Sequence, residues 1–333
     1  MLKILIILGI LLLTAILCLI AAGFLLAKKQ FDCRFEGGGD YFPYYSGLHP
    51  GWQRREISFS GDRGQLLRGC VFSYPKDSPR GLIVVYHGYG MSLDDYLPEC
   101  EYFCRRGYRV LAFDGTGTGH SQGKLTGLPQ HVLDLRDCLR MVGRDPELSR
   151  LPLLLYGHSW GGYGTDCVGA LEAFPIRGIV SASAFYNSLS ALAPHARRHY
   201  GPLAPLPLLG VRLYQWLRFG RLCGITAAQG LRAQRCPVLI TQSDDDFILP
   251  YRHNYMALYR KFHENPRFTF LPLTGRNHNI TTPRAVDQEK LKLLKVLRSP
   301  APPPEAQARI LELKAQADYA LLGQFADFFD RCL

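Results

Sequence analysis

Short β-rich runs alternate with helix-like stretches between residues 55 and 275. The runs have continuous apolar centres, such as LIVVY at 82–86, which is typical of parallel strands covered on both faces. The alternation predicts an α/β fold with a mostly parallel eight-stranded sheet flanked by helices. The predicted strands are 55–60, 66–75, 81–88, 108–114, 151–159, 176–184, 236–244 and 267–275. The predicted helices lie near 93–106, 128–142, 162–173 and 251–263.

One interval, residues 187–235, breaks this alternation and is called the insertion below. A structureless loop of that length is uncommon inside a compact domain, so we expect the insertion to be helical. It has no Asp or Glu and seven arginines, and therefore carries +7 of the formal net charge of +11. The arginines are Arg197, Arg198, Arg212, Arg218, Arg221, Arg232 and Arg235.

The N-terminus contains an uncharged apolar stretch from Ile4 to Ala27. At about 1.5 Å per residue, its 24 residues exceed the ~30 Å hydrocarbon core of a bilayer, which predicts a membrane-spanning helix. A cleaved signal peptide is the alternative, but its apolar region runs to only about 7 to 15 residues. Here the apolar run continues at 24–26 beyond the small residues at 21–23, which favours an uncleaved single-pass anchor.

The charges beside this stretch bear on its orientation. Lys28, Lys29 and Arg34 follow it, whereas Lys3 and the amino group precede it. The positive-inside rule therefore favours, by a small margin, a cytoplasmic position for the rest of the chain.

Composition bounds the remaining classes of function. With 47% hydrophobic and 20% charged residues, the 333-residue chain can bury a substantial core. Its net positive charge would suit nucleic acid, but no zinc-finger spacing, aromatic-rich basic strand motif or long Lys/Arg run accompanies it, so no nucleic-acid partner is expected. The ten cysteines form no C-x-x-C pair and no zinc-ligand spacing. They indicate free thiols in a reducing compartment, and we expect neither a metal nor a cofactor.

The strongest signal for chemistry is GHSWG at 157–161, which matches G-x-S-x-G between a predicted strand and a predicted helix. So sharp a turn forces the serine into a strained backbone conformation, and it leaves no room for side chains at the flanking glycines. This context makes Ser159 the candidate nucleophile.

From about residue 55 to residue 280, the strand order and this turn resemble the α/β-hydrolase superfamily, in its lysophospholipase, monoacylglycerol-lipase or serine-aminopeptidase-like branch. In that family an H-G segment after the third strand helps to hold the oxyanion, and VVYHGYG at 84–90 matches it. The resemblance implies that the backbone N–H groups of Tyr89 and Trp160 are the oxyanion donors. It also implies that His87 supports this loop rather than reacting.

A second segment, FDGTGTGHSQG at 113–123, resembles the family's D-x-x-G-x-G-x-S pattern and is called the glycine-rich loop below. In the family this loop shapes the floor of the pocket and braces the nucleophile turn. The resemblance therefore implies structural roles for Asp114 and His120.

A nucleophilic serine needs a histidine base, and the histidine needs a carboxylate that orients it. The family order is Ser, then Asp or Glu, then His. Five histidines follow Ser159, and only His278, in TGRNHN, comes directly after a strand in the place of the family's G-x-x-H. His278 is therefore the expected base.

The family's pattern around the acid is approximately H-G-x-x-D-x-x-V-P, which we compare with QSDDDFILP at 242–250. Both ends of the pattern place the acid at Asp246, although Gln-Ser replaces His-Gly and Leu replaces Val. Asp245 is the runner-up. Asp244, with whichever neighbour is not the acid, is expected to be a solvated loop residue or a local cap.

These residues specify acyl transfer through a Ser-His-Asp triad and an acyl-enzyme. Because the insertion combines apolar residues with arginines and the chain has a predicted anchor, we expect a carboxylic ester as substrate, with lipid-like acyl esters among the candidates. Ordinary helical packing with solvated arginines explains the insertion equally well. A prolyl-aminopeptidase-type peptidase and a non-catalytic binder on a hydrolase fold are the alternative functions.

The predicted organisation follows from these assignments. It comprises an anchor at 1–30, a connector at 31–54, an α/β-hydrolase core at 55–186 and 236–333, and a helical cap at 187–235.

Overall fold

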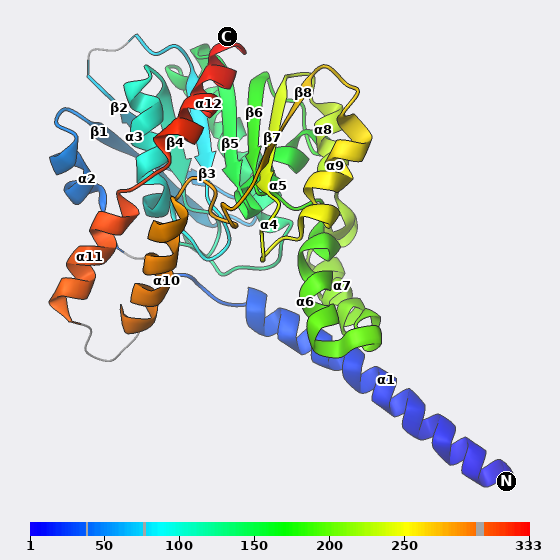
Figure 1. The fold of residues 1–333 in the computed structure, drawn as a ribbon. Helices are drawn as coiled ribbons and strands as arrows, with labels where there is room; N and C mark the ends of the chain where they lie inside the picture. Colours follow the sequence, from blue (N-terminus) through cyan, green and yellow to red (C-terminus); the bar gives the residue numbers. More distant parts are fainter. Residues whose placement is uncertain (38, 76–77, 298–302) are drawn as a thin grey trace.

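Continuous apolar runs form the central strands of a single eight-stranded sheet with the order β1-β2-β4-β3-β5-β6-β7-β8 (Figure 1). The computed structural model describes residues 1–37, 39–75, 78–297 and 303–333. Strand β2 runs antiparallel to both of its neighbours, and every other pairing is parallel. The predicted mostly parallel eight-stranded sheet is confirmed. The strands are β1 (Gln53–Ser60), β2 (Leu66–Ser73), β3 (Leu82–Tyr86), β4 (Arg109–Phe113), β5 (Leu153–His158), β6 (Ile176–Ala182), β7 (Val238–Ser243) and β8 (Phe268–Leu273).

Helices cover both faces of the sheet because alternate residues of the buried strands enter two separate cores. In β3, Leu82 and Val84 join the core that includes residues of α4 and α5, whereas Ile83 and Val85 join the core that includes residues of α3 and α12. The helices of the core region are α3 (Leu97–Arg105), α4 (Gln130–Arg144), α5 (Trp160–Cys167), α9 (Tyr255–Phe262), α10 (Arg284–Leu297), α11 (Pro304–Lys314) and α12 (Tyr319–Asp330).

The insertion between β6 and β7 folds into α6 (Ser188–Tyr200), α7 (Pro205–Phe219) and α8 (Ala227–Ala233). All seven of its arginines are exposed, and none forms an ion pair with another of the described residues. The stretch before β1, expected to be a connector, contains the short helix α2 (Phe42–Leu48), and β1 itself begins two residues earlier than predicted.

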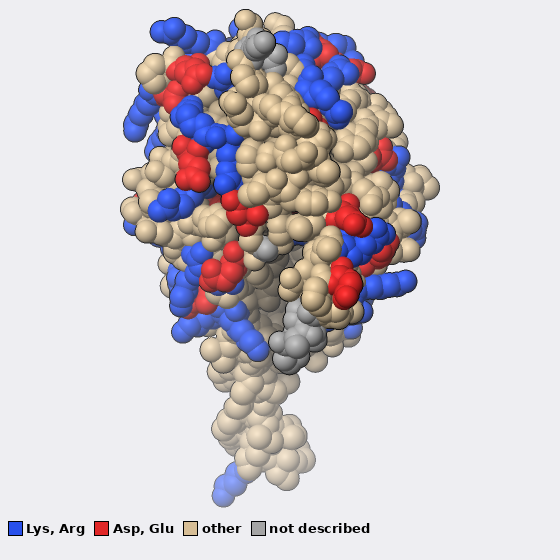
Figure 2. All heavy atoms as spheres, turned by 90° about the vertical axis from the view of Figure 1, so that its left-hand side faces the viewer, with Lys and Arg blue, Asp and Glu red and all other residues tan. Residues whose placement is uncertain are grey.

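Helix α1 (Leu2–Phe31) is long and apolar enough to cross a membrane. It runs beneath α6 and α7 and then projects away from the domain (Figure 1). Figure 2 shows Lys, Arg, Asp and Glu side chains spread over the domain, whereas the projecting helix is free of charge until its far end. Its last turns pack on α7, where the backbones come so close that a Cβ on Gly210 would meet the carbonyl oxygen of Ile20 at 1.9 Å.

Candidate active site

The turn from β5 into α5 holds Ser159 in a strained backbone conformation, with φ 56° and ψ −112°. Non-glycine residues rarely occupy this region, and such strain is typical of functional positions. Both flanking glycines are sterically required: a Cβ on Gly157 would lie 2.5 Å from the carbonyl oxygen of Gly161, and one on Gly161 would lie 2.1 Å from that of Tyr86. The sequence therefore produces the sharp turn that was expected at the serine.

The structure brings Ser159, His278 and Asp246 together from three separate loops. His278 Nδ1 lies 2.8 Å from Asp246 Oδ2, and His278 Nε2 lies 2.9 Å from Ser159 Oγ. Because a carboxylate only accepts hydrogen bonds, Nδ1 carries the proton and Nε2 is free to accept the serine hydroxyl. All three residues are less than 9% exposed. The arrangement lets His278 take the proton of Ser159 during nucleophilic attack.

The carboxylate of Asp246 has a hydrogen-bond donor at every position that its two oxygens offer. Oδ1 accepts from the backbone N–H of Ile248 and Leu249, while Oδ2 accepts from His278 and from Gln242 Nε2 at 2.9 Å. Burial by itself would raise the pKa of Asp246, but the hydrogen bond and charge of His278, with these further donors, hold it below its usual value. The carboxylate is therefore ionised and fixed in orientation.

Sequence reasoning missed the role of Gln242, which it treated only as a departure from the family's histidine. This buried side chain donates to Asp246 and to the carbonyl oxygen of Leu249, and its own oxygen accepts the backbone N–H of Tyr255. An amide can make these contacts simultaneously because it both donates and accepts. The glutamine thus ties the acid loop to α9.

The other two aspartates of this loop have different surroundings. Asp245 accepts from Ser243 Oγ and from the backbone N–H of Asn277, the residue before His278, and it pairs with Arg284 at 3.1 Å. Asp244 is exposed, and among the described residues its side chain accepts only from Thr274 Oγ1. The expectation of a local cap fits Asp245, which holds the loop that carries the histidine.

Tyr89 and Trp160, the expected oxyanion residues, lie beside the serine. A Cβ on Gly88 would stand 3.4 Å from Ser159 Cβ, and the rings of Tyr89 and Trp160 are 5.3 Å apart. Trp160 is the first residue of α5, where backbone N–H groups have no partner within the helix. Neither of the two N–H groups donates to an acceptor among the described residues. Both are available to a developing negative charge.

A buried pair, Tyr96 and His158, links the oxyanion loop to the histidine and was not foreseen. Tyr96 Oη accepts the backbone N–H of Gly88 and donates to His158 Nδ1, while His158 Nε2 donates to the carbonyl oxygen of His278 at 3.1 Å. Burial and the neighbouring His278 lower the pKa of His158 to about 3, so this ring stays neutral. In the sequence, the only sign of this pair is the histidine at the variable position before Ser159.

His87 and Asp114 support the surrounding loops, in agreement with expectation. His87 Nδ1 donates to the carbonyl oxygen of Gly88, and Nε2 accepts the backbone N–H of Gly115. Asp114 accepts the backbone N–H groups of Leu93 and His120. These contacts engage the functional atoms of both side chains and leave the two residues away from the Ser159–His278 pair.

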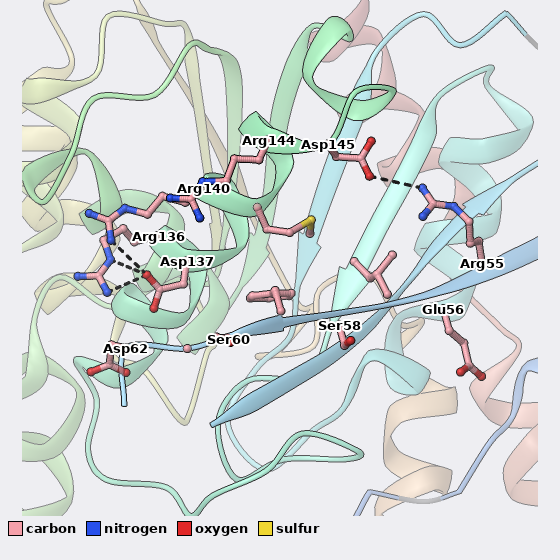
Figure 3. Close-up of a pocket in the computed structure, with 14 residues that line it drawn as sticks. Arg55, Glu56, Ser58, Ser60, Asp62, Arg136, Asp137, Arg140, Arg144 and Asp145 are labelled. Atoms are coloured by element: carbon pink, nitrogen blue, oxygen red, sulfur yellow. Dashed lines mark hydrogen bonds and ion pairs between the residues drawn. The ribbon is translucent and has the colours of Figure 1, made fainter. Parts of the chain in front are cut away.

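A groove of about 900 Å³ lies elsewhere, between β1 and α4 (Figure 3). Its charged side chains mostly neutralise one another, since Asp137 pairs with Arg136 and Arg140, and Asp145 lies near Arg55. None of the residues that carry the expected chemistry lines it. Among the residues with described positions, no group of three or more His, Cys, Asp or Glu is arranged to hold a metal.

Comparison with known sequences places this chain near lipases and peptidases. Residues 77–206, less than half of the chain, match the family model described as serine aminopeptidase, S33. A monoacylglycerol lipase of Mycolicibacterium smegmatis is 31% identical over 160 residues, which is 46% of this chain and 55% of that protein. A monoglyceride lipase of Rattus norvegicus is 32% identical over 100 residues, 30% of this chain and 33% of that protein. The chain therefore spans about half, or less, of the length of these relatives.

Solved structures share the fold over most of the chain. The Pyrococcus furiosus esterase Pf2001 aligns with a TM-score of 0.59 at 19% identity, covering 80% of this chain and 96% of that one. Est1E of Butyrivibrio proteoclasticus with bound ferulic acid aligns with a TM-score of 0.51 at 18% identity, covering 67% of this chain and 90% of that one. At these identities the likeness concerns the fold, and it confirms the predicted α/β-hydrolase architecture.

Proposed function

We propose that this α/β-hydrolase-fold protein is a serine hydrolase that cleaves a carboxylic ester, with Ser159 as nucleophile, His278 as base and Asp246 as the acid that orients it. The main support is the continuous hydrogen-bonded chain from Ser159 Oγ through the His278 ring to the Asp246 carboxylate. A strained serine with a base and an oriented carboxylate is the arrangement that acyl transfer requires.

In the proposed reaction, Ser159 Oγ attacks the substrate carbonyl carbon while its proton passes to His278 Nε2. The backbone N–H groups of Tyr89 and Trp160 stabilise the negative charge on the carbonyl oxygen. The carbon–oxygen bond to the leaving group breaks, the leaving group takes the proton from His278, and an acyl-serine remains. Water, deprotonated by His278, then attacks the acyl carbon; the bond to Ser159 Oγ breaks, Oγ takes the proton back from His278, and the acid is released. Asp246 stays ionised throughout and stabilises the charged imidazole.

The substrate class that we favour is a lipid-like acyl ester, such as a monoacylglycerol or a lysophospholipid. The two relatives compared above are named monoacylglycerol and monoglyceride lipase. Large apolar side chains of α7 are exposed beside the apolar α1, among them Trp216 at 55% and Leu217 at 60%. We further propose that the insertion is the cap over the site and accommodates an apolar chain.

We also propose that α1 is an uncleaved single-pass anchor and that the catalytic region is cytoplasmic. The support is the length and composition of α1 and the excess of Lys and Arg that follows it. Protease treatment of intact cells tests the orientation. A cytoplasmic domain is protected until the membrane is permeabilised, whereas digestion in intact cells would place it outside.

A peptidase is the second candidate because the matching family model is described as a serine aminopeptidase. An aminopeptidase must hold the positively charged N-terminus of its substrate, which calls for a carboxylate near the site. The insertion has no Asp or Glu to supply one. We therefore rank ester cleavage first.

Labelling of the purified full-length chain with a fluorophosphonate probe tests the proposal. We expect stoichiometric labelling that Ser159→Ala abolishes, together with a loss of ester hydrolysis of about 10⁴-fold or more. A panel of monoacylglycerols, lysophospholipids and aminoacyl amides then ranks the substrate classes. Absence of labelling in the unmodified chain would favour a non-catalytic binder, and preference for the amides would favour the peptidase.

A further inference from the structure

Helix α1 has two parts with opposite environments. The large apolar side chains from Leu2 to Leu13 are each more than half exposed, whereas Ala27 and Phe31 are 3% and 2% exposed. Gly23, Ala27 and Phe31 are four residues apart and lie on one face of the helix. The exposed first part is the one that lipid can surround, whereas the turns from Ile20 onward pack on the domain.

The buried face of the last turns packs on α7. A Cβ on Gly23 would meet the carbonyl oxygen of Pro207 at 2.0 Å, so only a glycine allows this approach. Farther along, the Phe31 ring stacks on Tyr214 of α7, with centroids 6.3 Å apart. These contacts fix both the rotation and the height of α1 relative to the domain.

The end of α1 then reaches Tyr89, whose backbone N–H is a proposed oxyanion donor. Tyr89 Oη donates to the carbonyl oxygen of Gln30 at 3.0 Å and accepts from Gln30 Nε2 at 2.6 Å. The rings of Phe31 and Phe35 meet the Tyr89 ring edge-on at 6.3 and 5.2 Å. The Tyr89 ring also lies 5.3 Å from the Trp160 ring, so the tyrosine contacts both the helix end and the nucleophile turn.

The chain immediately after α1 is joined to a second loop of the site. The Arg34 guanidinium donates to the carbonyl oxygens of Gly119 and Ser121 in the glycine-rich loop. The backbone of Phe35 donates to the Gly117 oxygen at 2.9 Å and accepts from the Gly119 N–H at 2.8 Å. Residues 30–35 thus contact both Tyr89, beside the serine, and the glycine-rich loop.

We propose that the last turn of α1 is a positioning element of the active site: Gln30 and Phe31 hold the Tyr89 side chain and thereby fix its backbone N–H where the oxyanion forms. The inference rests on the proposed function and adds a physical link from the helix in the bilayer to the oxyanion loop. An oxyanion donor works only when its direction is fixed before the charge develops. Neither Gln30 nor Phe31 touches the reacting atoms.

Two single-alanine insertions into the full-length chain, purified in detergent micelles, test the link. Each insertion rotates the parts of α1 on either side of it by about 100° relative to each other. An alanine between Lys28 and Lys29 takes Gln30 and Phe31 out of register with the turns that sit on α7. An alanine between Leu12 and Leu13, in the exposed part, leaves that register intact and is the control.

The readout is kcat per active site on a soluble p-nitrophenyl ester, with active sites counted by fluorophosphonate labelling. We expect the insertion after Lys28 to lower kcat by about tenfold or more and to leave KM within about twofold, because oxyanion contacts act mainly in the transition state. The insertion after Leu12 should leave both constants unchanged.

A milder variant keeps the proposal testable if the inserted helix disturbs folding. Tyr89→Phe retains the ring but loses both hydrogen bonds to Gln30, and should lower kcat per active site by about threefold to tenfold. Gln30→Ala should act in the same direction. Lys29→Ala, the neighbouring exposed side chain, should match the unmodified chain.

The possible results separate the hypotheses. Unchanged kcat per active site in the Lys28 insertion and in Tyr89→Phe overturns the positioning role. A smaller labelled fraction with normal kcat per labelled site also overturns it, because α1 would then act only on folding. An unmodified chain that neither hydrolyses the ester nor reacts with the probe overturns the proposed function itself, and the positioning role with it.

Discussion

The active site and the insertion use charge in opposite ways. At the site, the Asp246 carboxylate is 5% exposed and every acceptor position is filled by Gln242, His278 or a backbone N–H. In the insertion, seven arginines are exposed without an acidic residue among them. In the first arrangement, a buried carboxylate accepts a hydrogen bond from the His278 imidazole and orients it. The second leaves seven positive charges exposed to the surroundings of the domain.

The strongest test of the site is Asp246→Asn. The amide cannot hold the tautomer of His278 that accepts the serine proton, so kcat should fall by about 10³- to 10⁴-fold. Asp244→Asn is the matched control, because Asp244 is exposed in the same loop and should change kcat by less than about twofold. Ester hydrolysis assays measure both variants. The reverse ranking would mean that the acid has been assigned to the wrong aspartate.

Gln242→Leu tests how much the hydrogen bonds around Asp246 contribute to the stability of the fold. The substitution leaves an oxygen of Asp246, the Leu249 carbonyl and the Tyr255 N–H without their partner, in a buried setting. We expect a loss of about 2–4 kcal/mol in the free energy of unfolding, measured by denaturant titration. Gln242→His, which introduces the residue of the family pattern, should lose less. Equal losses would show that volume, rather than hydrogen bonding, decides stability there.

Much of the site was predictable because its main determinants are local in sequence. The strained turn at Ser159 needs glycines at fixed positions, and the order of serine, acid and histidine follows the order of the strands. The turn leaves a short pattern that a single sequence reveals, whereas Asp246 and His278 were assigned from the resemblance to the α/β-hydrolase superfamily. The same reasoning predicted all eight strands, because most are short apolar runs bounded by polar residues or turns, and the end of β1 alternates apolar with polar residues.

The supporting contacts were not predictable because they join segments that are distant in sequence. Tyr96 and His158 are 62 residues apart, and Gln30 and Tyr89 are 59 apart. No periodicity marks such pairs. The apolar pattern of α1 is also the same whether a turn faces lipid or α7, so the sequence predicted a membrane helix and missed the packing of its last turns.

Changing the insertion should affect recognition rather than chemistry. Replacing Arg197, Arg198, Arg212 and Arg221 with Gln should lower activity on anionic liposomes by about tenfold while leaving hydrolysis of a soluble ester unchanged. Near-surface cations contribute ~1 kcal/mol each toward anionic lipid, and the proposed anchor α1 would already supply much of the attachment. The variant with Lys at all four positions keeps the charge, and its activity on anionic liposomes should match that of the unmodified chain. Equal loss on both substrates would assign the arginines to folding.

The smallest expected effect is on the pH dependence of stability. It arises from the buried carboxylate of Asp246. Burial would raise the pKa of Asp246, but the hydrogen bond and charge of His278 lower it below the ~3.9 of an unfolded chain. The native state therefore binds fewer protons here than the unfolded state. This contribution to stability is present above about pH 4 and is lost as the pH falls through the native pKa of Asp246.

Asp246→Asn removes this linkage, so its free energy of unfolding should fall less steeply with acidification below pH 4 than that of the unmodified chain. Ser159→Ala keeps the pair of Asp246 with His278 and should retain the steeper dependence, although it abolishes turnover. Urea denaturation at a series of pH values measures all three chains. Parallel curves for the unmodified chain and Asp246→Asn would mean that His278 does not stabilise the carboxylate in the folded state. The pair of Asp246 with His278 would then contribute to catalysis and not to stability.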